Sequence, residues 1–70
     1  KRIISDPDIM LGKTIIKGTR ITVELVLRKT SEGMTIEELL EAYPHITRED
    51  IFAAFSYSAD VISMEELIAP

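Results

Sequence analysis

From residue 22 onward, the apolar positions repeat with the period of an α-helix, and polar residues divide the repeat into three segments. Helices are therefore predicted at residues 22–32, 35–43 and 47–60. Each predicted helix opens with a threonine whose hydroxyl can cap the free amides of the first turn: Thr22, Thr35 and Thr47. Gly33 favours the end of the first helix, and Pro44 ends the second because its ring disfavours a helical residue before it.

The apolar stripes of these helices define the expected core. Its members are Val23, Val26, Leu27 and Thr30 in the first helix, Ile36, Leu39, Leu40 and Tyr43 in the second, and Ile51, Ala54, Phe55, Ser58 and Ile62 in the third. Beyond the third helix, Ser63 and Glu66 form a further capping box, which predicts a short final helix or a tail over residues 63–70. The final segment, Val61 to Pro70, could fold back over Phe52, which stands outside the third stripe.

The first twenty residues follow a different pattern, rich in β-branched side chains and interrupted by Pro7, Gly12 and Gly18. Short strands are expected near residues 3–4, 9–10 and 14–16. A turn is expected at Gly12 and Lys13. Because a ribbon of this length is barely stable alone, it needs a helix layer or a second copy of itself beside it.

These elements predict a single mainly α domain with a short N-terminal β-ribbon and a trihelical helix-turn-helix core. Its expected parts are a ribbon at residues 1–20, a three-helix core at 21–62 and a short helix or tail at 63–70. Pairing of two ribbons would cover their exposed edges, so we expect a homodimer.

The composition narrows the class of protein. The chain has 70 residues, 46% of them hydrophobic, with no cysteine. It has no apolar run of membrane-spanning length and no signal-peptide pattern, so a cytoplasmic protein without a membrane role is expected. The net charge of −4 is unevenly divided, because residues 1–29 carry +4 and residues 30–70 carry −8. The overall acidity argues against strong nonspecific DNA affinity.

Residues suited to catalysis are few, and no enzymatic activity is expected. The single histidine, His45, lies in a predicted turn without a nucleophile placed beside it. Glu37, Glu38 and Glu41 line the outer side of a helix, which is typical of solvated charge rather than of a metal site. The glycine spacing does not match a phosphate-binding loop. No cofactor, metal or small-molecule substrate is therefore predicted.

Three stretches carry a resemblance to a known family: residues 12–23 (GKTIIKGTRITV), 31–40 (SEGMTIEELL) and 43–51 (YPHITREDI). Over about residues 3–60 the chain resembles the domain-of-unknown-function family four-three-three. The resemblance implies a homeodomain-like helix-turn-helix and a role as an antitoxin of the VapB kind, encoded beside a PIN-like ribonuclease toxin. Two positions depart from the family pattern: Thr14 stands where proline is frequent, and Phe52 where a polar or basic residue is usual.

Three functions remain open at this point: binding of a cognate nuclease toxin, binding of operator DNA by a dimer, and a protein-protein adaptor role without a toxin. For the first, the expected partner-binding residues are Phe52, Tyr57, Glu49 and Asp50. For the second, the expected phosphate contacts are Lys13, Lys17, Arg20, Arg28, Lys29 and Arg48. Ser56 and Tyr57 would join Arg48 if the third helix entered a groove of DNA.

Gly18, Thr19 and Arg20 lie together at the junction between the ribbon and the first helix. Arg20 could clamp a phosphate, but a structural role is favoured. Gly18 would supply a left-handed backbone conformation and Thr19 would bond to the local backbone. Arg20 would pair with an acid, such as Glu24 or one in the carboxyl half of the chain.

Overall fold

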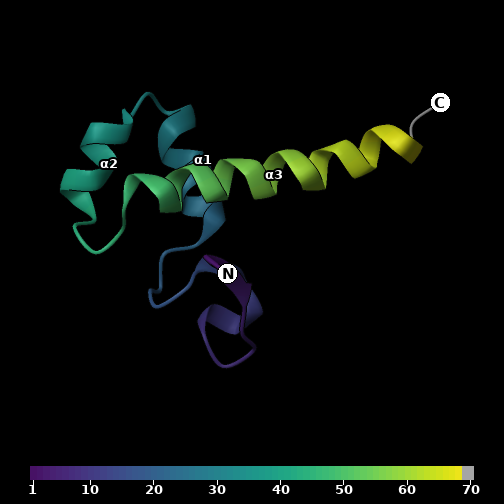
Figure 1. Cartoon of the computed structure of the whole chain (residues 1–70), viewed down its shortest axis with the longest axis horizontal. Coiled ribbons are helices and arrows are strands. Elements are labelled where there is room, and N and C mark those ends of the chain that lie inside the picture. The colour runs from purple at the N-terminus through teal and green to yellow at the C-terminus, as the bar shows by residue number, and fades with distance from the viewer. Residues whose placement is uncertain (69–70) are drawn as a thin grey trace.

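Three helices and a two-stranded antiparallel sheet make up the fold, which confirms the mainly helical prediction. The computed structural model describes residues 1–68 (Figure 1). In chain order the elements are β1 (Ile3–Ser5), the 3-10 turn η1 (Met10–Gly12), β2 (Thr14–Ile16), α1 (Val23–Ser31), α2 (Ile36–Ala42) and α3 (Arg48–Ile68). In this part of the chain, none of the helices is both long enough and apolar enough to cross a membrane.

The strands expected near residues 3–4 and 14–16 form, as their β-branched pattern predicts, and they pair with Ile4 opposite Ile15. The prediction of a strand at residues 9–10 is wrong, because the chain there forms a series of tight turns. The Asp6 carboxylate accepts the amide of Asp8 at 2.9 Å, and the Asp6 carbonyl accepts the amide of Ile9 at 3.0 Å. These local bonds use backbone groups that a strand would need, and the turn expected at Gly12 and Lys13 begins earlier, at η1.

The threonines predicted to start the helices all act as caps. Thr22 Oγ1 accepts a backbone amide from the first turn of α1 at 3.0 Å. Thr35 and Glu38 form a reciprocal capping box at the start of α2, with distances of 3.1 and 2.8 Å. Thr47 and Asp50 do the same for α3, at 3.1 and 2.9 Å. These bonds satisfy amides that would otherwise lack partners, which fixes where each helix begins.

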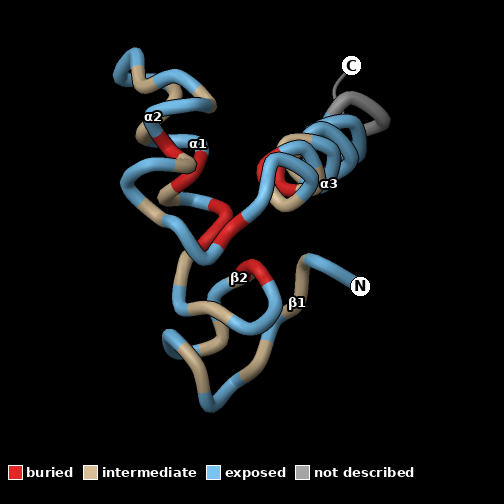
Figure 2. Tube along the Cα trace, turned by 60° about the vertical axis from the view of Figure 1, so that its left-hand side comes forward, coloured by how far each residue is buried: buried red, intermediate tan, exposed pale blue. Residues whose placement is uncertain are grey.

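The core lies where the helices and the sheet face one another, and Figure 2 shows buried positions on the facing sides of α1, α2, α3 and β2. The buried apolar residues are Ile15, Ile16, Val23, Val26, Leu39, Ile46, Ile51 and Ala54. Burial of each large aliphatic side chain stabilises the fold by about 1.5–3 kcal/mol. The helical stripes read from the sequence supply most of this core, but Leu27 and Ile62 remain exposed.

The third helix is longer than expected, since α3 runs for 21 residues without a break. The separate short helix predicted from Ser63 is therefore wrong. Ser63 Oγ donates to the Asp60 carbonyl at 2.7 Å, as a serine inside a helix does, instead of capping a new one. Residues 48–68 contain neither glycine nor proline, so nothing in the sequence interrupts the helix. The end of the predicted tail, residues 69–70, lies outside the described residues.

The direction of α3 also corrects a second expectation. Figure 1 shows its C-terminal half extending away from the other elements instead of turning back. Residues 61–68 therefore do not cover Phe52, whose side chain is half-exposed.

Candidate functional site

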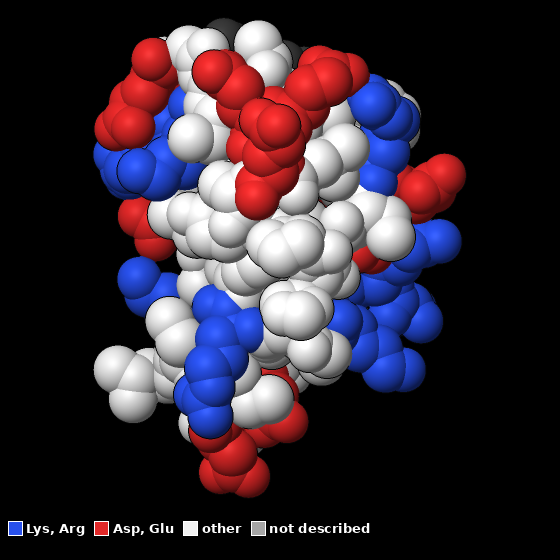
Figure 3. Space-filling model, turned by 90° about the vertical axis from the view of Figure 1, so that its left-hand side faces the viewer, with Lys and Arg blue, Asp and Glu red and all other residues white. Residues whose placement is uncertain are grey.

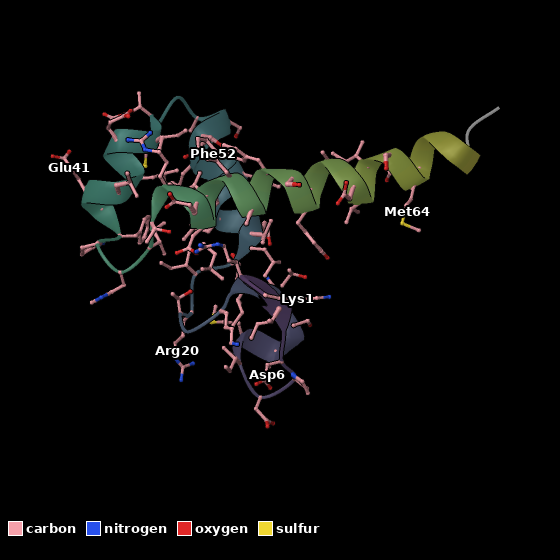
Figure 4. The ribbon with its side chains drawn as sticks, in the orientation of Figure 1. Lys1, Asp6, Arg20, Glu41, Phe52 and Met64 are labelled. Carbon is pink, nitrogen blue, oxygen red and sulfur yellow. The ribbon has the colours of Figure 1, made fainter. Side chains whose placement is uncertain are left out.

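One side of α3 carries an exposed aromatic side chain. This side is called the outer face and is defined by Glu49, Phe52 and Ser56. These residues follow one another at intervals of three and four, so they share one side of the helix. All three are exposed, while Ile51 is completely buried on the opposite side. Phe52 is 50% exposed, and Figure 4 shows the first turns of α3, which carry it, lying beside α2.

The structure separates the four residues that the sequence grouped as partner contacts. Glu49 and Phe52 lie together on the outer face. Tyr57 lies on another side of α3, where its hydroxyl is 3.3 Å from Thr14 Oγ1 of β2. Asp50 is mostly buried and engaged within the fold, so it is not available to a partner in the way that Glu49 is.

The Asp50 carboxyl holds several elements together. Its Oδ1 lies 3.0 Å from Arg2 Nη1, and its Oδ2 accepts the Thr47 amide. Burial raises the pKa of Asp50, but the Thr47 amide, the Arg2 guanidinium and the Thr47 hydroxyl outweigh it and leave the pKa below its usual value. The charged carboxylate is thus stabilised where the strand β1 meets the start of α3.

Half of the predicted DNA contacts are already paired with acids. Glu24 binds Arg28 at 3.1 Å and Lys13 at 3.3 Å, and these two cations, Arg28 first, lower the pKa of Glu24. Arg48 binds Glu37 at 3.0 Å. The pKa of Glu37 is lowered by its own backbone amide and then by Arg48. These cations are partly neutralised before any phosphate could reach them.

The other predicted DNA contacts are Lys17, Arg20 and Lys29, and no ion pair joins them to another described residue. Arg20 extends away from the body of the molecule (Figure 4). Its expected pair with Glu24 does not form, because Lys13 and Arg28 occupy that carboxylate. On the face seen in Figure 3, a broad uncharged band crosses the middle, with a group of acidic side chains above it flanked by basic ones, and both basic and acidic side chains below it.

The structural roles predicted for the neighbours of Arg20 are confirmed. Gly18 has a φ of +83°, the left-handed conformation that glycine adopts without strain. Thr19 Oγ1 donates to the Ile16 carbonyl at 2.7 Å and accepts the Ile21 amide at 3.0 Å. The junction thus turns the chain from β2 into α1.

An apolar groove lies between β2, α1 and the C-terminal half of α3, and it was not predicted from the sequence. Its volume is about 360 Å³. Thr14, Leu27, Tyr57, Val61 and Ile62 are among its lining residues. The groove exists because α3 continues past residue 60, and the absence of glycine and proline there was the signal that could have revealed it.

Titratable side chains do not gather into a metal-binding cluster within the described part of the chain. His45 is exposed in the connection between α2 and α3. Glu37, Glu38 and Glu41 are exposed on α2, as expected of solvated charge. Figure 4 shows Glu41 pointing away from the fold.

Together these features define a small three-helix protein with an N-terminal two-stranded sheet and exposed apolar side chains on its longest helix. Residues 3–58 match the model of a family described as "Protein of unknown function (DUF433)". The chain belongs to the DUF433 family.

The chain is similar to two known proteins. It is similar to a crystal structure of a DUF433 member protein from Anabaena variabilis, with a TM-score of 0.80 and 31% identity, over 99% of this chain and 69% of that one. It is 36% identical over 56 residues to the uncharacterized protein y4eO of Sinorhizobium fredii. That alignment covers 80% of this chain but 25% of y4eO, so the chain spans about a quarter of that relative's length.

Proposed function

We propose that this protein is a non-catalytic binding module of the antitoxin kind, which binds a PIN-like nuclease through the outer face of α3. The nuclease is the partner implied by the resemblance described above. The proposal extends to α2, which with α3 would form a helix-turn-helix that presents the outer face. The observation that carries the proposal is the half-exposed aromatic ring of Phe52.

Phe52 has the properties of an anchor residue. It stands one turn inside a capped helix, and the Thr47–Asp50 capping box and the Arg2 ion pair hold that helix in place. A rigidly presented aromatic side chain loses little conformational freedom on binding and buries a large apolar area. Such residues contribute much of the binding energy in protein interfaces.

The charge of the surrounding surface supports a nuclease as the partner. Residues 30–70 carry −8. Glu49 is exposed on the outer face, and Glu37, Glu38 and Glu41 are exposed on α2, which lies beside the first turns of α3 (Figure 4). An enzyme that binds RNA needs basic side chains to hold the phosphates. An acidic, rigid helix complements such a surface, speeds association and discriminates against acidic partners.

Co-expression with the nuclease encoded beside this chain's gene tests the proposal. We expect the two proteins to purify together, and Phe52→Ala to weaken the complex while leaving the circular-dichroism spectrum unchanged. Leu11→Ala is the matched control, because it truncates an apolar side chain that is 96% exposed on the turn between the strands. Equal retention of the nuclease by both variants, or no complex with the wild-type chain, would overturn the proposal.

A further inference from the structure

We infer that the C-terminal half of α3 pairs with the same segment of a second copy of this chain. This segment, residues 57–65, is called the arm below. The pairing would be antiparallel, with each arm lying along the apolar groove of the other copy. The inference does not depend on the proposed nuclease binding, because the arm follows the outer face along α3 and shares no residue with it.

Three apolar residues of the arm, together with Ala54 just before it, have the spacing of a helix-pairing seam. Ala54, Tyr57, Val61 and Met64 follow one another at intervals of three, four and three residues. This is the a/d spacing that places knobs of one helix into holes of another. Ala54 is buried against the protein's own core, but the exposed fractions rise to 39% for Tyr57, 46% for Val61 and 65% for Met64. The seam thus begins inside the fold and continues where the described part of the chain leaves it exposed.

The groove and the seam form one continuous surface. Tyr57 and Val61 belong to both, and Leu27 of α1 and Thr14 of β2 form the other wall of the groove. A surface that contains both a projecting arm and a groove beside it can complement itself about a two-fold axis. In such a dimer the same contacts would bury Val61 and Met64 of both copies.

Charge favours the antiparallel arrangement. The charged residues described on the arm, Asp60 and Glu65, are both acidic. Lys13 and Glu24 line the groove, and Glu24 also pairs with Arg28, which leaves an excess positive charge beside the groove. Antiparallel pairing places the arm's acids near these cations, whereas parallel pairing would set the acids of the two arms side by side.

Pairing also stabilises the folded chain, because association that buries apolar surface favours the folded state by mass action. The occupant that the arm's spacing, groove and charge all fit is therefore another arm.

Sedimentation velocity at micromolar concentrations tests the pairing. The wild-type chain is expected to sediment as a dimer. Val61→Glu places a charge in the centre of the seam and is expected to give a monomer. Ala59→Glu adds the same charge at an exposed position off the seam and is expected to remain a dimer. A monomeric wild-type chain, or a monomeric Ala59→Glu variant, would overturn the inference.

A second variant keeps the test decisive if Val61→Glu fails to fold. Met64→Glu changes a side chain that is 65% exposed, so its folded state should be intact by circular dichroism. It is also expected to give a monomer, with a dissociation constant raised at least about tenfold. A dimer that survives both substitutions would mean that the copies associate elsewhere, for instance through the ribbon, and would contradict arm pairing.

Discussion

Arg2 Nη1 lies 3.0 Å from Asp50 Oδ1, so an ion pair joins the chain just before β1 to the first turn of α3 across 48 positions of sequence. The same carboxylate completes the capping box with Thr47. Asp50 therefore both starts the helix that carries Phe52 and fixes that helix against the strand. The outer face owes its rigid presentation to this arrangement.

Removal of the Asp50 carboxylate should destabilise the fold more than removal of its ion-pair partner. We expect Asp50→Ala to lower the free energy of unfolding by about 1–2 kcal/mol, because the helix loses a cap. Arg2→Ala should cost less than about 1 kcal/mol, because the guanidinium is largely exposed. Urea denaturation measures both, and an equal loss in the two variants would show that the capping box contributes little.

The lowered pKa of Asp50 predicts a pH dependence of stability. A carboxyl whose pKa is lower in the folded than in the unfolded state stabilises the fold above the unfolded value of about 3.9. That contribution is lost as the pH falls through the folded pKa. Wild type should therefore be more stable than Asp50→Asn at neutral pH, and the gap should narrow in acid. A gap that stays constant down to pH values below the folded pKa would contradict the assignment.

Gly18 should be hard to replace although there is space around it. No heavy atom lies within 4 Å of the position that a Cβ would take, but φ is +83°. Alanine there should cost about 1–2 kcal/mol through backbone strain alone. Gly18→Asn should cost less, because asparagine tolerates this conformation better. Thermal unfolding of the two variants checks the order, and the reverse order would exclude backbone strain as the cause.

DNA binding should be weak and sensitive to salt. The acids that pair with Lys13, Arg28 and Arg48 reduce the number of phosphates that the chain can neutralise. In a gel-retardation assay with the DNA upstream of its own gene, we expect any shift to disappear at physiological salt. A sequence-specific shift that persists there, and that is lost in Lys17→Ala combined with Arg20→Ala, would instead favour the operator-binding hypothesis.

The helix starts were predictable from sequence because they depend on local chemistry. Thr22 and Thr35 cap amides only three residues away, so the spacing of polar residues is sufficient to place them. The prediction of a strand at residues 9–10 was wrong for a related reason. The turn that Asp6 begins is also local, and it outweighs the β-strand preference of the residues that follow. The prediction of a new helix from Ser63 was wrong because a capping-box pattern starts a helix only where the preceding helix has ended, and no helix breaker precedes Ser63.

The candidate site was predictable only in part because it depends on long-range contacts. The helical period placed Phe52 outside the core stripe, and the structure finds it half-exposed. It could not show what Tyr57 meets, since the Tyr57 hydroxyl lies beside Thr14 of a strand 43 positions away. The helical period also could not reveal that the Asp50 carboxylate forms an ion pair with Arg2. The groove required both the length of α3 and the position of β2.

The central claim is that Phe52 on the outer face of α3 anchors a partner nuclease. Calorimetric titration of the purified PIN-like nuclease that the family resemblance implies, with the wild-type chain, Phe52→Ala and Leu11→Ala, tests it most directly. We predict saturable binding by the wild-type chain and by Leu11→Ala, and at least about a thirtyfold weaker affinity for Phe52→Ala, the effect of losing an anchor worth about 2 kcal/mol. Equal affinity of all three proteins, or no heat of binding for the wild-type chain, would contradict the account.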